Sequence, residues 1–404
     1  MKDTAPLPSP CVYFQVHQPF RLVEYDFFRI GQHAYYENDW LNQEVFEKVA
    51  EKSYLPATRL FRELVRETDG RFRLALSFSG LALAQMADYR PDVLEAFQEL
   101  VGTGAVEVLG ETYYHSLASL RSPREFERQV DLHREKVGKL FGVEPRVFRN
   151  TELVYSNDLA LAAEEMGFEG ILGEGVSWLL RSRSPNYVCQ PPNTAGIKTL
   201  LRNPGLSDDI AFRFSDRNWK EFPVTAEKFV GWIGKHPGDI VNLFMDLESL
   251  GEHQWADSGI FDFWRDFAHL TLRKGGRFVT PSEAIAEFKP RHTYDCRQPT
   301  SWADYERDLS AWLGNVMQKE AADKVSALEA DVLATEDPQL IHAWSKLQTS
   351  DHLHYMSTKG GTDGEVHGYF SPYDSPYDAY IYFMNALADL QIRVQRAVTP
   401  CAAA

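Results

Sequence analysis

The sequence of 404 residues predicts an α/β fold built on a parallel sheet. Short apolar runs of strand character alternate with helical patterns along most of the chain, as in strands joined by crossover helices. The strands are mostly continuous apolar runs, which is typical of strands covered on both faces. Polar residues gather at their carboxyl ends, where both parallel barrels and doubly wound sheets place reactive groups. The pattern alone leaves these two architectures open.

Seven segments have the composition of strands. They are residues 11–17, 71–80, 106–115, 146–153, 170–175, 239–249 and 277–285. Five of these strands carry a polar residue at or near their carboxyl ends: His17, Ser79, His115, Glu152 and Asp246. We therefore expect these five side chains to meet at one end of the sheet.

Helical periodicity fills the intervals between the first strands. It covers residues 45–68, 81–104, 122–142 and 156–167. Pro56 is expected to break the first of these helices or to start a turn. Ser122 and Pro123 form an N-terminal capping signal, and Gly167 is a C-cap candidate.

The pattern changes after about residue 290, where helical segments follow one another. These segments are residues 301–334, 337–356 and 375–398. The sequence therefore predicts a first domain over 1–290 and a C-terminal helical domain over 291–404. A Gly-, Asp- and Tyr-rich loop over 357–378 interrupts the helices, and we expect it to face the cleft because long loops of this kind are often functional.

Composition excludes several classes of protein. The formal charge of −16 argues against a nucleic-acid-binding surface. No stretch of about 20 apolar residues predicts a membrane span, and the N-terminus lacks a signal-peptide core. The four cysteines (Cys11, Cys189, Cys296 and Cys401) form no CxxC pair, so we expect no disulfide framework or structural zinc and a cytoplasmic location. P-loop, GxGxxG and GxSxG motifs are missing, so no cofactor is expected.

Two carboxylates at strand ends, Glu152 and Asp246, fit the chemistry of glycoside hydrolysis. Arg149 and Asn150 precede Glu152, and their donors could hold it ionised. Asp246 leaves an apolar strand, so desolvation would raise its pKa and suit it to acid catalysis. The plainer alternative is that both are helix caps or ion-pair partners.

Three histidines, His17, His115 and His253, lie near the same strand ends. They could bind a metal, but they show no HxxxH or HExxH spacing, so we expect bonds to sugar hydroxyls and no metal. Aromatic residues near the same ends offer flat faces for sugar rings: Tyr113, Tyr114, Tyr155, Trp178, Trp219 and Trp255. Trp232 and Trp264 are expected in the core.

Two further segments carry polar clusters. Residues 200–214, with paired aspartates, have the composition of a surface loop. His352, His354 and His367 could form a weak metal cluster, but a polar lid over the cleft is the preferred interpretation.

Five motifs, in order, resemble the five sequence regions of glycoside hydrolase family 57. They are HQPFR (17–21), VEVLGETYYHS (106–116), FRNTELVYSND (148–158), MDLESLGEHQW (245–255) and FVTPSEAI (278–285). The resemblance implies an incomplete (β/α)7 barrel followed by a helical domain, and a retaining mechanism on α-glucans. It implies Glu152 as nucleophile and Asp246 as general acid/base, with His17 and Glu107 in the donor-sugar subsite.

The remaining expected substrate contacts are Gln18, His115, Asn150, Trp178, Glu248, His253 and Trp255. The chain is most similar to short family members called α-amylases, which predicts hydrolysis of α-1,4-glucans. A 4-α-glucanotransferase or branching enzyme would use the same carboxylates. A metal-dependent polysaccharide deacetylase and a catalytically silent glucan-binding protein are the alternatives from other classes. Oligomeric state stays open.

Overall fold

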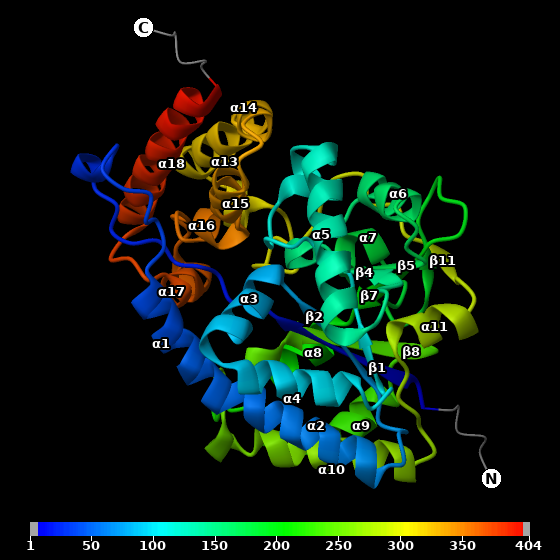
Figure 1. The fold of residues 1–404 in the computed structure, drawn as a ribbon. Helices are drawn as coiled ribbons and strands as arrows, with labels where there is room; N and C mark the ends of the chain where they lie inside the picture. Colours follow the sequence, from blue (N-terminus) through cyan, green and yellow to red (C-terminus); the bar gives the residue numbers. More distant parts are fainter. Residues whose placement is uncertain (1–6, 399–404) are drawn as a thin grey trace, which may run out of the picture.

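The computed structural model describes residues 7–398, so Cys401 lies outside the described residues. Two larger sheets supply most of the strands (Figure 1), and a third, small sheet pairs β9 (Leu250–Gly251) with β10 (Gln254–Trp255). The first has the order β3-β2-β1-β8, all parallel: β1 (Ser9–Val16), β2 (Leu74–Phe78), β3 (Val106–Val108) and β8 (Ile240–Asp246). The second has the order β11-β6-β7-β5-β4: β4 (Val147–Phe148), β5 (Gly170–Glu174), β6 (Cys189–Gln190), β7 (Lys198–Arg202) and β11 (His292–Thr293).

The two sheets close on each other as a barrel. A parallel bridge pairs Gly110, just after β3, with Phe148 of β4. On the other side, Asn203 N donates to Asn242 O at 2.9 Å, and Asn242 Nδ2 donates to Leu201 O at 2.8 Å, joining β7 to β8. The ring therefore runs β1-β2-β3-β4-β5-β7-β8, and the predicted seven-stranded (β/α)7 barrel is confirmed. β6, which runs antiparallel to β7, lies outside the ring.

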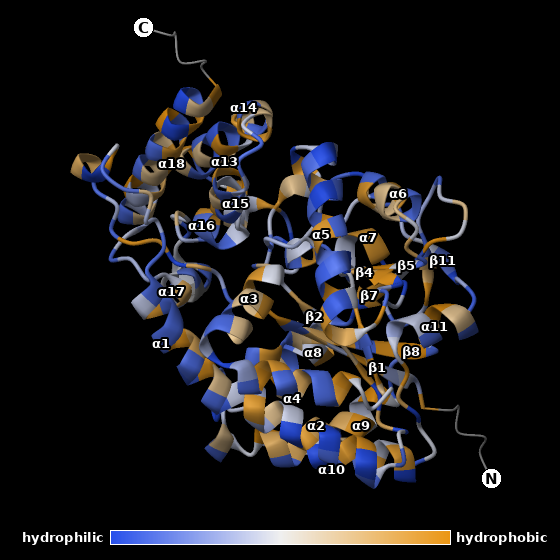
Figure 2. Ribbon diagram, viewed as in Figure 1, coloured by the Kyte–Doolittle hydropathy of each residue, from blue (hydrophilic) through white to orange (hydrophobic). Residues whose placement is uncertain are grey.

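Helices cover the barrel, and the predicted cap at Ser122 is found at the start of one of them. Those up to β8 are α1 (Asp39–Val49), α2 (Leu55–Glu67), α3 (Gly80–Tyr89), α4 (Pro91–Val101), α5 (Pro123–Phe141), α6 (Asn157–Glu165), α7 (Ser177–Leu180), α8 (Pro204–Ala211) and α9 (Ala226–Ile233). Ser122 caps α5 by accepting from Glu125 N. Pro91 divides the predicted helix 81–104 into α3 and α4, because the residue before proline avoids helical geometry. In Figure 2 the barrel strands are mainly apolar, and hydrophilic residues concentrate on the surrounding helices.

The later helices follow the barrel: α10 (Ile260–Arg273), α11 (Pro281–Glu287), α12 (Ser310–Leu313), α13 (Val316–Ala327), α14 (Glu329–Ala334), α15 (Pro338–Leu347), α16 (Ser350–His354), α17 (Gly361–Phe370) and α18 (Pro376–Val398). Helices α13 to α18 stand beside the barrel (Figure 1). The buried Asp389 of α18 accepts from Gly31 N at 2.5 Å and Tyr36 Oη at 2.6 Å, so α18 also holds the loop before α1. Among the described residues, no helix is long and apolar enough to cross a membrane.

Three predicted segments differ from the structure. Residues 277–285 are not a strand: Thr280 and Glu283 form a capping box and Pro281 starts α11. Residues 200–214 are not a surface loop, because they contain the end of β7 and the Asn203-capped helix α8. Residues 357–378 are not a continuous loop, because α17 lies within them.

A close backbone contact joins the helices around Pro56 to the turn after β8. A π-helical segment, Ala50–Tyr54, leads into α2, and Pro56 lacks the N–H that would bond the Lys52 carbonyl. Gly251, with φ +101°, packs against this carbonyl, and a Cβ there would lie 1.8 Å from Lys52 O. Only glycine fits both the conformation and the space.

We expect Gly251→Ala to lower the free energy of unfolding by about 3 kcal/mol, because it adds a steric clash to a left-handed backbone. Gly231→Ala is the matched control, since a Cβ at this α9 position meets nothing within 4 Å. The control should stay within about 1 kcal/mol of wild type, on the stabilising side. Thermal or urea unfolding measures both, and equal stabilities for the two variants would contradict the account.

Candidate active site

A layer of polar side chains closes the carboxyl end of an apolar barrel interior. Below it, alternate residues such as Tyr13, Leu109 and Phe244 form one apolar cluster. The next inward positions, one per strand or directly after it, are Gln15, Ser77, Glu111, Arg149, Glu174, Arg202 and Asp246. Backbone register places Gln15 opposite both Ser77 and Asp246, and Glu174 opposite Arg202. Each strand therefore delivers one polar group to the same end.

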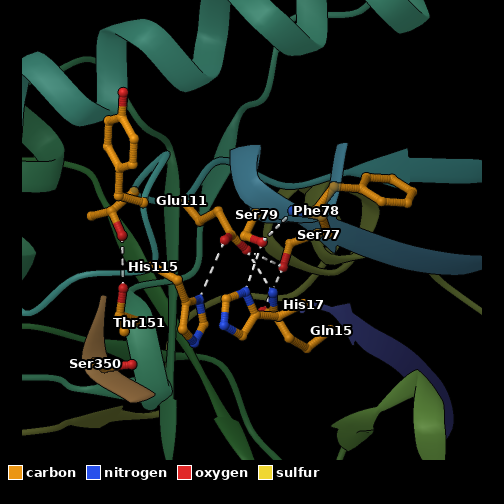
Figure 3. Close-up of polar contacts among 12 residues, drawn as sticks. Gln15, His17, Ser77, Phe78, Ser79, Glu111, His115, Thr151 and Ser350 are labelled. Atoms are coloured by element: carbon orange, nitrogen blue, oxygen red, sulfur yellow. Dashed lines mark hydrogen bonds and ion pairs between the residues drawn. The ribbon is translucent and has the colours of Figure 1, made fainter. Parts of the chain in front are cut away.

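Hydrogen bonds tie part of this layer together (Figure 3). Glu111 Oε2 accepts from Gln15 Nε2 at 2.9 Å and from Ser77 Oγ at 2.7 Å. Across the barrel, Arg202 Nη1 pairs with Glu174 at 3.3 Å. These partners compensate side chains that are almost fully buried.

Glu152 and His115 are held in strained turns directly above the layer. Their φ values are +58° and +50°, in the left-handed region that non-glycine residues rarely adopt. Thr112 and Thr151 join the two turns through a hydroxyl–hydroxyl bond of 2.7 Å. Strain of this kind is a common feature of functional sites.

Both carboxylate oxygens of Glu152 have donors. His115 Nε2 lies 3.2 Å from Oε1, and Trp302 Nε1 donates to Oε2 at 2.8 Å. Burial opposes ionisation, but the hydrogen bond and charge of His115, with the charge of Arg149, lower the pKa of Glu152 to about 2.

His115 is the cation of this group. Burial would lower its pKa, but its contacts with Glu111 and Glu152 raise the pKa to about 9. Its Nδ1 lies 3.5 Å from Glu111 Oε1. The same contacts lower the pKa of Glu111 to about 2 against its burial. His115 is therefore charged at neutral pH and lies between two anions.

His17 stacks on His115, with ring centroids 3.8 Å apart and planes 18° from parallel (Figure 3). Its Nε2 lies 2.9 Å from Asp351 Oδ2, and its Nδ1 lies 2.7 Å from Ser79 Oγ. Burial and the adjacent charge of His115 lower the pKa of His17, so the ring is neutral. Nε2 then donates to Asp351, and Nδ1 accepts from the hydroxyl of Ser79.

The pKa values of Asp246 and Glu248 are raised, whereas that of Glu152 is lowered. Burial, and then the charge of Glu152, raise the pKa of Asp246 to about 6. Burial, and then Asp246, raise the pKa of Glu248 to about 8. Glu248 is bonded by Tyr54 Oη at 2.5 Å and Gln18 Nε2 at 3.2 Å. The site thus holds an ionised carboxylate beside carboxyls that favour their protonated forms.

Some expected residues lie elsewhere. Glu107 is on β3 opposite Ala75, toward the amino ends of the strands, and it accepts from Ser282 N and Oγ at 2.8 and 2.6 Å. It is therefore not brought together with Glu152. Asn150 donates to Ser119 Oγ and to Val154 O, within the turn.

The aromatic candidates do not form one group: Tyr155 is fully buried in a core cluster, whereas two of the tryptophans are exposed. Trp178 is 53% exposed on α7, and Trp255 is 63% exposed with Lys52 Nζ 5.7 Å from its ring centre. His253 makes an edge contact with Phe370 of α17, with ring centroids 5.7 Å apart. The expectation that 357–378 faces the cleft stays a prediction.

The C-terminal helical domain supplies residues that the sequence pattern did not identify. Trp302, Ser350 and Asp351 all contact Glu152 or His17. They lie about 150 to 330 residues away in sequence, so no local spacing reveals them. Glu111 was also missed, although it stands within the second motif, four residues before His115.

The histidines of the site are engaged by protein side chains. Both nitrogens of His17 and Nε2 of His115 have hydrogen-bond partners, and His115 Nδ1 lies 3.5 Å from Glu111, so the rings are not arranged as a free zinc-ligand set. His354 stacks on His367, whereas His352 packs on Phe383. Within residues 7–398, one cluster of three carboxylates is compact enough to share an ion: Asp304, Glu306 and Asp363. Lys359 Nζ already pairs with this cluster, at 2.6 Å from Asp304 and 3.0 Å from Glu306.

Comparisons with known proteins point to one family. The model of glycosyl hydrolase family 57 matches residues 11–297. A Methanocaldococcus jannaschii protein, provisionally named an alpha-amylase, is 40% identical over 95% of this chain and 84% of its own length. A 4-alpha-glucanotransferase from Thermococcus litoralis is 20% identical over 61% of this chain and 37% of its own.

Solved structures share the fold. The branching enzyme from Thermococcus kodakaraensis superposes with a TM-score of 0.70 over 97% of this chain and 92% of its own, at 14% identity. The branching enzyme from Pyrococcus horikoshii gives 0.66 over 90% and 87%, at 18% identity. With the family match over most of the barrel and the relative at 40% identity, the chain belongs to glycosyl hydrolase family 57.

Proposed function

We propose that this enzyme is a retaining glycoside hydrolase of α-1,4-glucans, with Glu152 as nucleophile and Asp246 as general acid/base. One observation carries the assignment of roles: two carboxyls of one buried cluster have pKa values moved in opposite directions, Glu152 to about 2 and Asp246 to about 6. Retaining hydrolysis needs one ionised and one protonated carboxyl.

The reaction follows from these two states. The Glu152 carboxylate attacks the anomeric carbon and forms a glycosyl–enzyme ester, while Asp246 gives its proton to the departing glycosidic oxygen. Water then attacks the anomeric carbon, Asp246 takes a proton from it, and the ester bond to Glu152 breaks. His115 and Trp302 hold Glu152 against rotation in both steps.

Glu248 is proposed to bind the sugar as a neutral acid. Its raised pKa leaves a proton on the carboxyl, so it can donate a hydrogen bond as well as accept one. Tyr54 and Gln18 fix its orientation. A sugar hydroxyl, which both donates and accepts, suits such a partner.

Substrate class and location are part of the same proposal. The name of the M. jannaschii relative supports α-amylase-type hydrolysis, whereas the T. litoralis relative supports glucan transfer as the second candidate. In transfer, an acceptor sugar takes the place of water in the second step. Three buried free thiols, Cys11, Cys189 and Cys296, support a reducing, cytoplasmic setting.

Glu152→Gln and Asp246→Asn should each lower kcat on maltoheptaose by roughly 10³-fold or more, because each removes one essential carboxyl function. Release of reducing ends measures the rate. Glu107→Gln is the matched control: it should cost about 1 kcal/mol of stability through its Ser282 contacts and leave kcat unchanged. Turnover at the wild-type rate in either first variant would overturn the roles.

The pH dependence of kcat/KM should be bell-shaped with an acidic optimum. Asp246 acts in its protonated form, and its raised pKa keeps that form up to about pH 6, so activity falls as pH rises through this value. Glu152 acts ionised, and its lowered pKa keeps it so down to about pH 2. A rate that stays constant between about pH 5 and 9 would contradict the assignment of Asp246.

Product analysis separates hydrolysis from transfer. With maltoheptaose we expect shorter saccharides whose new reducing ends first appear in the α configuration, as retention requires. Products longer than the substrate, or new α-1,6 branches, would favour the transferase instead. Initial β products, observed by NMR before mutarotation, would refute the retaining mechanism.

A further inference from the structure

Arg149 is a member of the inward polar layer to which the proposed reaction gives no role. The residue is fully buried, and its Nε, Nη1 and Nη2 atoms form no hydrogen bond with any described residue. The guanidinium carbon lies 4.9 Å from the ring centre of Trp302, the residue whose indole N–H holds Glu152. A buried charge without a direct partner is costly, so its surroundings must compensate it.

Carboxylates surround this guanidinium at longer range. Arg149 N donates to Gly110 O at 2.8 Å, which places it beside the strand that carries Glu111. Its charge acts on Glu111, Glu152 and Asp246. The other titratable groups facing the two catalytic carboxyls are Tyr13 on β1, His115 after β3 with His17 stacked on it, Arg202 on β7, Tyr54 and Glu248 around the end of β8, and Asp351 and His354 of α16.

Arg149 reduces the net negative charge of this cluster. At neutral pH the pKa directions leave Glu111, Glu152 and Asp351 as anions. His115 is the one cation that touches Glu152 directly. Removing Arg149 would leave these three anions with His115 as the one cation that touches Glu152, and Asp246 adds a fourth anion as pH rises through about 6.

We propose that Arg149 is a positioning residue for the reaction: its guanidinium is a fixed counter-charge, shared by the two catalytic carboxyls, that keeps Glu152 an anion beside the acid form of Asp246. This inference rests on the proposed roles of those carboxyls. His115 bonds Glu152 directly, so it lowers the pKa of Glu152 in particular and separates it from the pKa of Asp246. Arg149 touches neither, so it stabilises the ionised form of both and sets where the active pH range lies.

Arg149→Met tests this with an uncharged side chain of similar length. The pKa of both carboxyls should rise, so both limbs of the kcat/KM–pH profile should move to higher pH by about one unit. Arg149→Lys keeps the charge and should keep the wild-type limbs. Arg134→Met is the matched control, because Arg134 also stacks on an aromatic ring, Phe168 at 4.2 Å, but on α5 outside the barrel; its profile should not move.

The pH profile of the Arg149 variants either supports the proposed role of Arg149 or overturns it. A folded Arg149→Met variant with the wild-type profile, or with a raised KM as its only change, would overturn the proposal, since the latter indicates substrate contact. If that variant does not fold by circular dichroism, Arg149→Lys decides: wild-type limbs support the shared charge, and limbs moved to higher pH refute it. Activity in Glu152→Gln would instead refute the underlying roles, whatever Arg149 does.

Discussion

The enzyme depends on burying a closed layer of mutually compensating charges on top of an apolar barrel interior. Glu111, Arg149 and Asp246 occupy the same end of the barrel because each follows an inward-facing apolar residue of its strand. A buried charge is tolerated only beside an opposite charge or a hydrogen-bond partner. The order of the strands therefore fixes which charges are neighbours. Neighbouring charges lower the pKa of Glu152, whereas burial, and then the charge of Glu152, raises the pKa of Asp246.

The same constraint joins the two parts of the chain. The barrel positions Glu152 and His17, but the groups that bond them, Trp302 and Asp351, come from the segments after the barrel. Docking of the helical domain thus completes the hydrogen bonds that hold the side chains of the site. The left-handed turns at His115 and Glu152 bring the barrel's side of this arrangement within reach of those partners.

Much of this could be predicted from local sequence, and the exceptions have physical reasons. The strand ends and the two carboxyls, Glu152 and Asp246, follow from apolar runs that stop at a charge. Glu107 and Glu111 both face the barrel interior, so alternation alone does not show which of them reaches the site. β3 ends at Val108 and Glu107 bonds Ser282, which leaves Glu111 at the carboxyl end. Trp302 and Asp351 depend on tertiary docking, which no spacing encodes. The prediction of a strand over 277–285 was wrong because a helix-capping signal follows the apolar start of this segment.

The central claim, that Glu152 is the nucleophile, is tested most directly by trapping the covalent intermediate. A fluorinated maltosyl fluoride should form a slowly hydrolysed ester, and mass spectrometry of the digested protein should find the sugar on the peptide that contains Glu152. The sugar should be missing from the same peptide of Glu152→Gln. A sugar ester on Glu111 or Asp246, or efficient turnover of the reagent with inverted configuration, would contradict the account.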